Sequence, residues 1–278
     1  MVKFDIETER ELKKFLDSVK RIKGVDLSSY RKSFLLRRTK IRMAIRNIKN
    51  LTEYFYLIKK DPQEWRYFLD NLNINVSEFF RDPEVYFQFQ KVCIPELIKR
   101  KEEKKQKIIR CWSCGCSCGE EPYSLAIVFK EALREKINNF ILSIWATDID
   151  EEALEIAKKG EYTLNSLKRL NEYFLKNYFI KISDSLYRVK DEIKKMVIFK
   201  KHNILTQRPL KNMDVIFFRN LRIYFDPLKA KDILLEIYKS LKKDGYLILG
   251  KVETIDFSLR KLFTPVDIAN KIFKKTRR

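Results

Sequence analysis

The chain has 278 residues, 45% of them hydrophobic and 35% charged, which is typical of a globular protein with a substantial core. It contains no run of about eighteen apolar residues, and the charged segment MVKFDIETERELKKF lacks the apolar stretch of a signal peptide. We therefore expect a cytoplasmic protein without direct membrane insertion. The formal net charge of +21 favours an anionic partner, although a generally basic composition explains it equally well.

The first part of the chain, residues 1–72, predicts a small all-α domain. Apolar residues recur at helical spacing in ETERELKKFLDSVKRI and LSSYRKSFLLRRTKIRMAIRNI, and LTEYFYLIKK and PQEWRYFLDNL predict two shorter helices. Pro62 suits the first turn of the last helix. The stretch Leu27–Thr52 has eight basic residues and no Asp or Glu, which indicates either a solvated basic face or a docking surface for an acidic partner.

Residues 73–278 predict an α/β domain with a mostly parallel, doubly wound sheet. Buried strands are expected at IIRCWS, LSIWATDID, MDVIFFRN and YLILG, and helices at EEPYSLAIVFKEALREK, EEALEIAKKG and PLKAKDILLEIYKSLKK. Strands that alternate with helices in this way form a sheet covered by helices on both faces. The shorter alternating pieces in residues 186–201 predict a small antiparallel β insertion.

The turn SCGCSCGEE lies between a predicted strand and a predicted helix, where open α/β sheets bind their ligands. Gly115 and Gly119 allow a tight turn and a close approach of the backbone to a ligand. Glu120 and Glu121 at the helix start would repel a phosphate. They suit a ligand with a positive group, such as the sulfonium or α-amino group of S-adenosylmethionine, although the helix dipole also accounts for one of them.

Four of the five cysteines fall within a span of eight residues at this turn: Cys111, Cys114, Cys116 and Cys118. Such clustering is compatible with a metal or redox site. No second cluster of Cys or His supplies further ligands, and His202 is the single histidine. We therefore expect no metal, and interpret the cysteines as small residues that pack a tight loop.

Two acids, Asp148 and Asp150, end the next predicted strand. An acid at this position typically accepts hydrogen bonds from ribose hydroxyls, and we assign that role to Asp148. Asp150 suits the N-cap of the helix that follows. The separation between Gly119 and these acids is longer than usual in dinucleotide-binding domains, which counts against an NAD enzyme.

The chain resembles the CheR-type chemotaxis receptor glutamate O-methyltransferases. The similar segments follow the family's order and register from about residue 12 onward: NVSEFFRDPEVY, RCWSCGCSCGEEPYSLAI, ATDIDEEALEIAKKGEY, FFRNLRIYFD and LKKDGYLILGKVE. The resemblance implies a helical amino-terminal domain and a Rossmann-like S-adenosylmethionine methyltransferase domain with a small antiparallel insertion. Hydrophobic patterning independently predicts the same organisation.

The resemblance also implies roles for individual residues. Arg81 and Tyr224 match catalytic positions. A further set matches positions that contact S-adenosylmethionine and its product S-adenosylhomocysteine: Asn75, Ser77, Arg81, Glu121, Asp148, Asn203, Ile204, Arg219 and Asn220. The segment Leu249–Glu253 departs from the family pattern, which has His or Arg and then Ser before the Glu, so no role for this loop is implied.

The implied reaction is methyl transfer to a glutamate carboxylate. Because a carboxylate is already ionised at neutral pH, no strong general base is needed, and catalysis comes mostly from alignment of the reacting groups. We expect Arg81 to hold the substrate carboxylate and Tyr224 to place a hydroxyl beside the methyl group. The alternative is that Arg81 pairs with a nearby acid and Tyr224 packs in the core.

The implied partners are the cytoplasmic methylation helices of chemoreceptors, whose glutamates become methyl esters during sensory adaptation. A basic helix would attract such acidic helices, and we assign this role to Arg37, Arg38, Arg42 and Arg46. We expect a monomer that binds no nucleic acid, because no Asn/Asp-Pro-Pro-Tyr-like element and no interleaved basic and aromatic platform occurs. The alternatives are methylation of another protein or of nucleic acid in a different signalling pathway, and a cofactor-binding module without catalysis.

Overall fold

The computed structural model describes residues 6–73 and 77–276, which form two compact units. Of the described residues, the first unit comprises 6–73 and 223–232. The second comprises 77–222 and 233–276. Within the described ranges, no helix is both long enough and apolar enough to span a bilayer.

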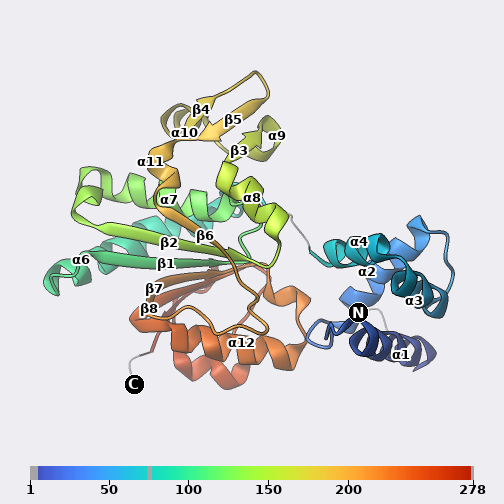
Figure 1. Cartoon of the computed structure of the whole chain (residues 1–278). Helices are drawn as coiled ribbons and strands as arrows, with labels where there is room; N and C mark the ends of the chain where they lie inside the picture. The colour runs from blue at the N-terminus through green and yellow to red at the C-terminus, as the bar shows by residue number, and fades with distance from the viewer. Residues whose placement is uncertain (1–5, 74–76, 277–278) are drawn as a thin grey trace. The chain divides into compact units, whose positions relative to one another are not determined.

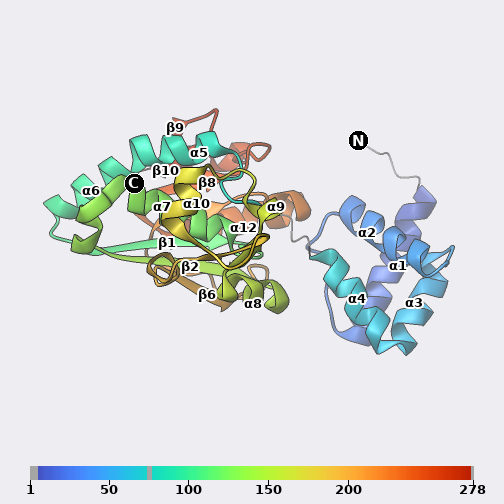
Figure 2. The ribbon, with the colours of Figure 1, turned by 90° about the horizontal axis from the view of Figure 1, so that it is seen from above.

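The first unit is a bundle of four helices, as predicted (Figure 2). They are α1 (Ile6–Lys23), α2 (Lys32–Ile45), α3 (Leu51–Lys60) and α4 (Pro62–Leu72). In its core the Phe15 and Tyr54 rings stack, the Phe68 ring meets both edge-on, and all three are almost fully buried. The Asp61 side chain caps α4 by accepting hydrogen bonds from two backbone N–H groups, and Pro62 occupies the first turn.

A buried ion pair joins α2 to α4 inside this unit. The Arg42 guanidinium binds both carboxylate oxygens of Glu64, with Nε–Oε1 3.0 Å and Nη2–Oε2 2.7 Å. The Tyr54 hydroxyl donates to the same carboxylate, whose side chain is 1% exposed. Arg46 lies 3.6 Å from Glu64 and 3.8 Å from Asp61. Two of the four arginines predicted to bind substrate are therefore engaged within the bundle.

The second unit is built on a seven-stranded sheet with the order β6-β2-β1-β7-β8-β10-β9. Its parallel part comprises β1 (Ile108–Cys114), β2 (Ile141–Asp148), β6 (Val197–Lys201), β7 (Met213–Phe218) and β8 (Leu241–Leu249). Every residue of β7 is buried, as its continuous apolar run predicts. Two strands that were not predicted, β9 (Phe263–Asp267) and β10 (Ile272–Lys275), extend the sheet in antiparallel fashion beyond β8.

Helices cover both faces of this sheet (Figure 1). From β1 the chain passes through α7 (Glu120–Leu133) to β2, and through α8 (Glu151–Lys159) on towards β6. From β7 it passes through α12 (Pro227–Ser240) to β8, in the opposite direction along the sheet. Right-handed crossovers in opposite directions place α7 and α12 on opposite faces. Next to α7 lie the π-helix η1 (Phe89–Cys93) and α6 (Ile94–Glu103), and α5 (Pro83–Gln88) precedes η1.

The small antiparallel sheet lies earlier in the chain than predicted. It has the order β3-β5-β4, with β3 (Glu161–Thr163), β4 (Phe179–Lys181) and β5 (Leu186–Val189). The helices α9 (Leu164–Leu167) and α10 (Glu172–Tyr178) lie between its strands. The predicted bounds of 186–201 were wrong because Val197–Lys201 forms β6, which pairs in parallel with β2 as an edge strand of the main sheet. The alternation of an edge strand resembles that of an isolated hairpin.

The Arg42–Glu64 pair leads to a stability prediction. An Arg42→Ala substitution removes the bidentate partner of a buried carboxylate and leaves it only the longer, 3.6 Å pair with Arg46, so we expect the free energy of unfolding to fall by about 3 kcal/mol. Urea denaturation followed by circular dichroism measures this loss. The exposed Arg37 on the same helix is the control, and Arg37→Ala should change the value by less than about 0.5 kcal/mol. Equal effects of the two substitutions would contradict the assignment.

Candidate functional site

The predicted site residues of the second unit gather at the carboxyl ends of its parallel strands. The loops that follow β1, β2, β6, β7 and β8 meet along this edge, where open α/β sheets bind their ligands. Some of the strained backbone of the chain lies in the same region. Four non-glycine residues have positive φ angles of 50°, 60°, 49° and 57°, respectively: Phe80, Asp82, Ser117 and Asn220. Such conformations are costly and tend to occur at functional sites.

The glycine turn after β1 is fixed to β2. The backbone N–H groups of Gly115 and Cys116 both donate to the Thr147 carbonyl, at 2.8 and 3.0 Å. Gly119 has φ +96°, and a Cβ there would lie 2.9 Å from both the Ala157 Cβ and the Tyr162 hydroxyl. Only glycine therefore fits this position, which confirms the predicted tight turn.

Asp148, at the end of β2, is held in place by the same turn. One carboxylate oxygen accepts from the Ser117 N–H at 2.8 Å and the other from the Asp150 N–H at 3.0 Å. These bonds use two of the about four acceptor positions of a carboxylate, which leaves capacity for ribose hydroxyls. Burial raises the pKa of Asp148. Asp150 caps α8, as predicted.

Glu120 and Glu121 begin α7 and are both withdrawn from solvent. Glu121 accepts from the Ser113 hydroxyl at 2.7 Å and pairs with the Arg219 guanidinium at 3.4 Å. Burial raises its pKa in spite of these partners. Burial also raises the pKa of Glu120, whose Oε2 has no hydrogen-bond partner among the residues that the structure describes. Buried acids short of cations fit a ligand that carries positive charge, as the sequence predicted.

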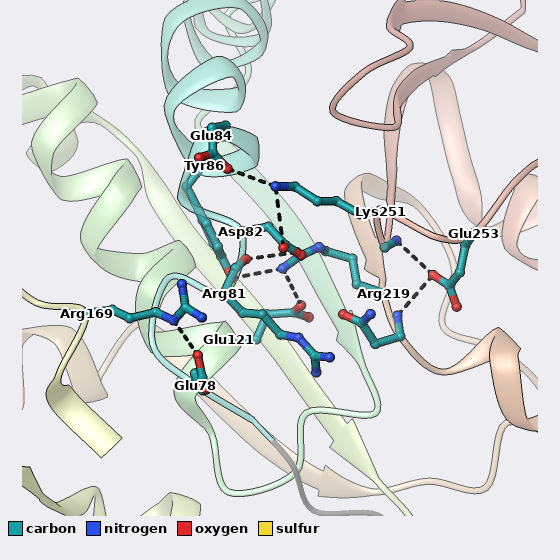
Figure 3. A network of polar contacts seen from close by, with 12 residues as sticks. Glu78, Arg81, Asp82, Glu84, Tyr86, Glu121, Arg169, Arg219, Lys251 and Glu253 are labelled. Atoms are coloured by element: carbon teal, nitrogen blue, oxygen red, sulfur yellow. Dashed lines mark hydrogen bonds and ion pairs between the residues drawn. The ribbon is translucent and has the colours of Figure 1, made fainter. Parts of the chain in front are cut away.

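The segment from Ser77 to Asp82, which precedes α5, is tied to this acidic turn. The Ser77 side chain hydrogen-bonds to Glu120, and the Phe80 N–H donates to the Ser124 hydroxyl at 2.9 Å. Glu78 pairs with Arg169, as Figure 3 shows. Asn75, also predicted to contact the cofactor, lies outside the described residues.

Arg219 connects this segment to the sheet. Its Nη2 donates to the Arg81 carbonyl at 2.9 Å and to Asp82 at 2.7 Å, and its guanidinium lies 5.5 Å from the centre of the Tyr86 ring (Figure 3). The side chain is only 1% exposed, so Arg219 is a buried connector as well as a predicted cofactor contact. The contact with the cofactor stays a prediction. Asp82 and Tyr86, which contact the Arg219 guanidinium, were not among the predicted site residues. Asp82 directly follows Arg81 in the SEFFRD motif.

The turn after β6 carries the two residues expected near the adenine. The Asn203 side chain accepts from the Leu205 N–H at 2.9 Å. The backbone N–H of Asn203 donates to the Gln207 side chain at 2.8 Å. The His202 N–H donates to the Asp148 carbonyl at 2.8 Å, which brings this turn beside the ribose acid. The roles of Asn203 and Ile204 stay predictions.

Tyr224 belongs to the first unit. Its ring lies 5.2 Å from that of Phe34, and its carbonyl accepts from the Arg31 N–H at 2.9 Å. Its predicted catalytic role is not tested by these contacts. Of the predicted substrate-binding arginines, Arg37 is exposed and Arg38 is half-buried.

The cysteines of the glycine turn are free thiols. Cys111, Cys114 and Cys116 are buried and Cys118 is partly exposed. Burial raises the pKa of all four thiols, which disfavours the thiolate needed for metal or redox chemistry. Across residues 6–73 and 77–276, no three His, Cys, Asp or Glu side chains are grouped as a metal site would require.

Comparisons with known proteins agree with this geometry. A family model described as the all-alpha domain of CheR methyltransferase matches residues 10–72, and one described as the SAM binding domain of CheR methyltransferase matches residues 75–272. A chemotaxis protein methyltransferase of Borreliella burgdorferi is 33% identical over 252 residues, covering 89% of this chain and 89% of that protein. One from Listeria innocua is 32% identical over 249 residues, covering 90% and 92%. One from Salmonella typhimurium is 30% identical, covering 85% and 83%.

The buried carboxyl of Glu121 leads to a pH prediction. Because burial raises its pKa above the unfolded value, ionisation costs stability, and this cost appears as the pH rises through the folded-state pKa. A bound ammonium group offsets the cost only when the carboxylate is charged. We therefore expect the rise in Tm caused by S-adenosylhomocysteine, measured by scanning fluorimetry, to be larger at about pH 7 than at about pH 5. Glu121→Gln should reduce this pH dependence, and an unchanged dependence in the variant would contradict the role of Glu121.

Proposed function

The chain belongs to the CheR methyltransferase family, and we propose that it methylates glutamate side chains of chemoreceptors in sensory adaptation. The observation that carries this function is that the matched SAM binding domain contains the buried acids at the carboxyl edge of the sheet. When bound, S-adenosylmethionine supplies the methyl group from its sulfonium. The enzyme is a protein-glutamate O-methyltransferase.

We assign the parts of the cofactor to the loops of the sheet edge. Glu121, whose pKa is raised by burial, would bind the α-amino group as a charge-assisted hydrogen-bond acceptor. Asp148, fixed by two backbone N–H groups, would accept from the ribose hydroxyls. Asn203 and Ile204, in the turn beside Asp148, would border the adenine. Ser77 would contact the cofactor from the segment before α5. Arg219 binds this segment through the Arg81 carbonyl and the Asp82 side chain.

The chemistry needs alignment more than proton transfer. The attacking glutamate is ionised at neutral pH, so no general base is required. The single histidine of the sequence, His202, faces the Trp112 ring and the Arg208 carbonyl. Arg81 would hold the substrate carboxylate and Tyr224 would orient it. A positioned nucleophile supplies most of the rate enhancement in such a reaction.

The acidic methylation helices of the receptor would dock on α2. Because Arg42 is paired with the buried Glu64, the exposed Arg37 and the half-buried Arg38 of the same helix would be the principal cations of this surface. Exposed charges of this kind accelerate association and depend on salt. We expect the protein to act as a cytoplasmic monomer.

Transfer of a labelled methyl group tests the function. Tritiated S-adenosylmethionine is incubated with the protein and receptor cytoplasmic fragments, or with DNA or RNA as alternative acceptors. We expect label in the receptor fragment only, released as methanol by mild alkali because a carboxyl methyl ester is base-labile. Label on nucleic acid, or alkali-stable label on protein, would overturn the assignment.

The two predicted catalytic residues are tested in the same assay. Arg81→Ala and Tyr224→Phe should each lower kcat/KM for the receptor by about 100-fold, because each removes an interaction that aligns the nucleophile. Binding of S-adenosylhomocysteine to Tyr224→Phe should stay within about threefold of the wild type. Full activity in either variant would remove that residue from the mechanism.

A further inference from the structure

Glu253 is a buried acid, 3% exposed, in the loop that follows β8. Its Oε2 accepts from the Asn220 N–H at 3.0 Å and from the Gly250 N–H at 2.8 Å. Its Oε1 accepts from the Arg222 N–H at 2.9 Å. Three backbone donors from two separate loops thus converge on one carboxylate. Figure 3 shows the Glu253 carboxylate with two of its hydrogen bonds.

These hydrogen bonds fix the conformation of the loop after β7. Asn220 has φ +57°, a left-handed conformation that a non-glycine residue adopts at a cost unless its surroundings hold it. Its N–H and that of Arg222 both point to Glu253, so the carboxylate holds the turn from both sides. Gly250 completes the fit, because a Cβ there would lie 2.9 Å from the Asn220 backbone nitrogen and from the Glu253 carboxylate.

The loop fixed in this way carries Arg219 and Asn220. Arg219 reaches from it to Glu121 and Asp82, and so connects it to the acidic turn and to the segment that carries Arg81. A shift of the loop would displace the Arg219 guanidinium from both carboxylates. The position of Glu121, the proposed amino-group ligand, thus depends indirectly on Glu253.

A second residue of the same loop, Lys251, makes weaker contacts. Its Nζ lies 3.1 Å from Glu84 and 3.7 Å from Asp82, and its side chain is 47% exposed (Figure 3). Exposed ion pairs contribute little because water and salt screen them. Hydrogen bonds from buried N–H groups to a charged carboxylate are much stronger. Glu253 is therefore the residue that determines the position of the loop.

We infer that Glu253 is a positioning residue of the cofactor site, which acts through the backbone of Asn220 and Arg222. This inference rests on the proposed function, because it assumes that the edge formed by the loops after β1 and β7 binds S-adenosylmethionine. It assigns a role to the segment Leu249–Glu253, where the sequence departs from the family pattern and the resemblance implies none. Glu253 itself need not touch the cofactor or the substrate.

The test is Glu253→Gln, in the full-length protein. Glutamine has the same size, but its amide places an N–H₂ donor against backbone donors and removes the charge. We expect the Kd for S-adenosylhomocysteine, measured by calorimetry, and the KM for S-adenosylmethionine to rise by about tenfold, the equivalent of one charge-assisted hydrogen bond. At saturating cofactor, kcat should stay within about threefold of the wild type, because a displaced loop weakens binding without removing a reacting group.

The control is Glu96→Gln, the same change at an exposed glutamate of the second unit, whose side chain is 48% exposed. Glu96 accepts from the Tyr246 hydroxyl at 2.6 Å and pairs with Lys274, and among the described residues it has no hydrogen bond or ion pair with the site loops. The Glu96→Gln substitution should therefore lower Tm and leave the Kd unchanged. Glu253→Asp, which keeps the charge but shortens the side chain, provides a second variant should the glutamine variant not fold.

The outcomes separate the inference from the function on which it rests. If the wild type binds S-adenosylhomocysteine and the folded Glu253 variants bind it equally well, Glu253 only stabilises the fold and the inference is overturned. The same holds if the Glu96 control weakens binding as much as Glu253→Gln does. If the wild type itself does not bind S-adenosylhomocysteine, the proposed cofactor site fails, and the inference fails with it.

Discussion

The cofactor edge depends on the buried guanidinium of Arg219. A buried charge costs several kcal/mol unless it is paired, so Arg219 requires Asp82, Glu121 and the Arg81 carbonyl to stay where they are. These partners come from the segment before α5 and from the start of α7. The motifs SEFFRD, GEEPYS and FRN therefore depend on one another. FRN supplies the buried guanidinium, and the other two motifs supply its hydrogen-bond acceptors. Ser124 adds to this by accepting the Phe80 N–H.

Four carboxyl groups withdrawn from solvent lie at the same edge. Burial raises the pKa of Glu120, Glu121, Asp148 and Glu253. Their roles differ because their partners differ. Glu253 has three backbone donors and acts on the loop, whereas Glu120 has an oxygen without a partner among the described residues. Such a site suits a cationic cofactor. A positive group of the ligand offsets the free-energy cost of ionising a buried carboxyl group.

Several points that the sequence pattern leaves open share one cause. Near-helical spacing predicts that Arg37, Arg38, Arg42 and Arg46 form one face, but spacing does not tell whether a face meets solvent or another helix. Arg42 on that face pairs with the buried Glu64 of α4, so this part of the face lies against another helix. Likewise, the alternating pattern of Val197–Lys201 identified a strand but not its partner, and the residues of β9 and β10 carry too weak a pattern to be recognised. Pairing between distant segments decides these points.

The amino-acid sequence by itself determined the α/β class, the preceding helical domain, the glycine turn and the position of Asp148 and Glu121 at strand and helix ends. Periodicity and turn chemistry are local properties, so they can be read from neighbouring residues. Only the tertiary structure decided that Arg42 pairs with an acid inside the bundle and that the Arg219 side chain is buried. It also decided that Glu253 accepts hydrogen bonds from backbone N–H groups more than thirty positions earlier in the chain. Burial and long-range hydrogen bonds arise when distant segments meet, and no local pattern records them.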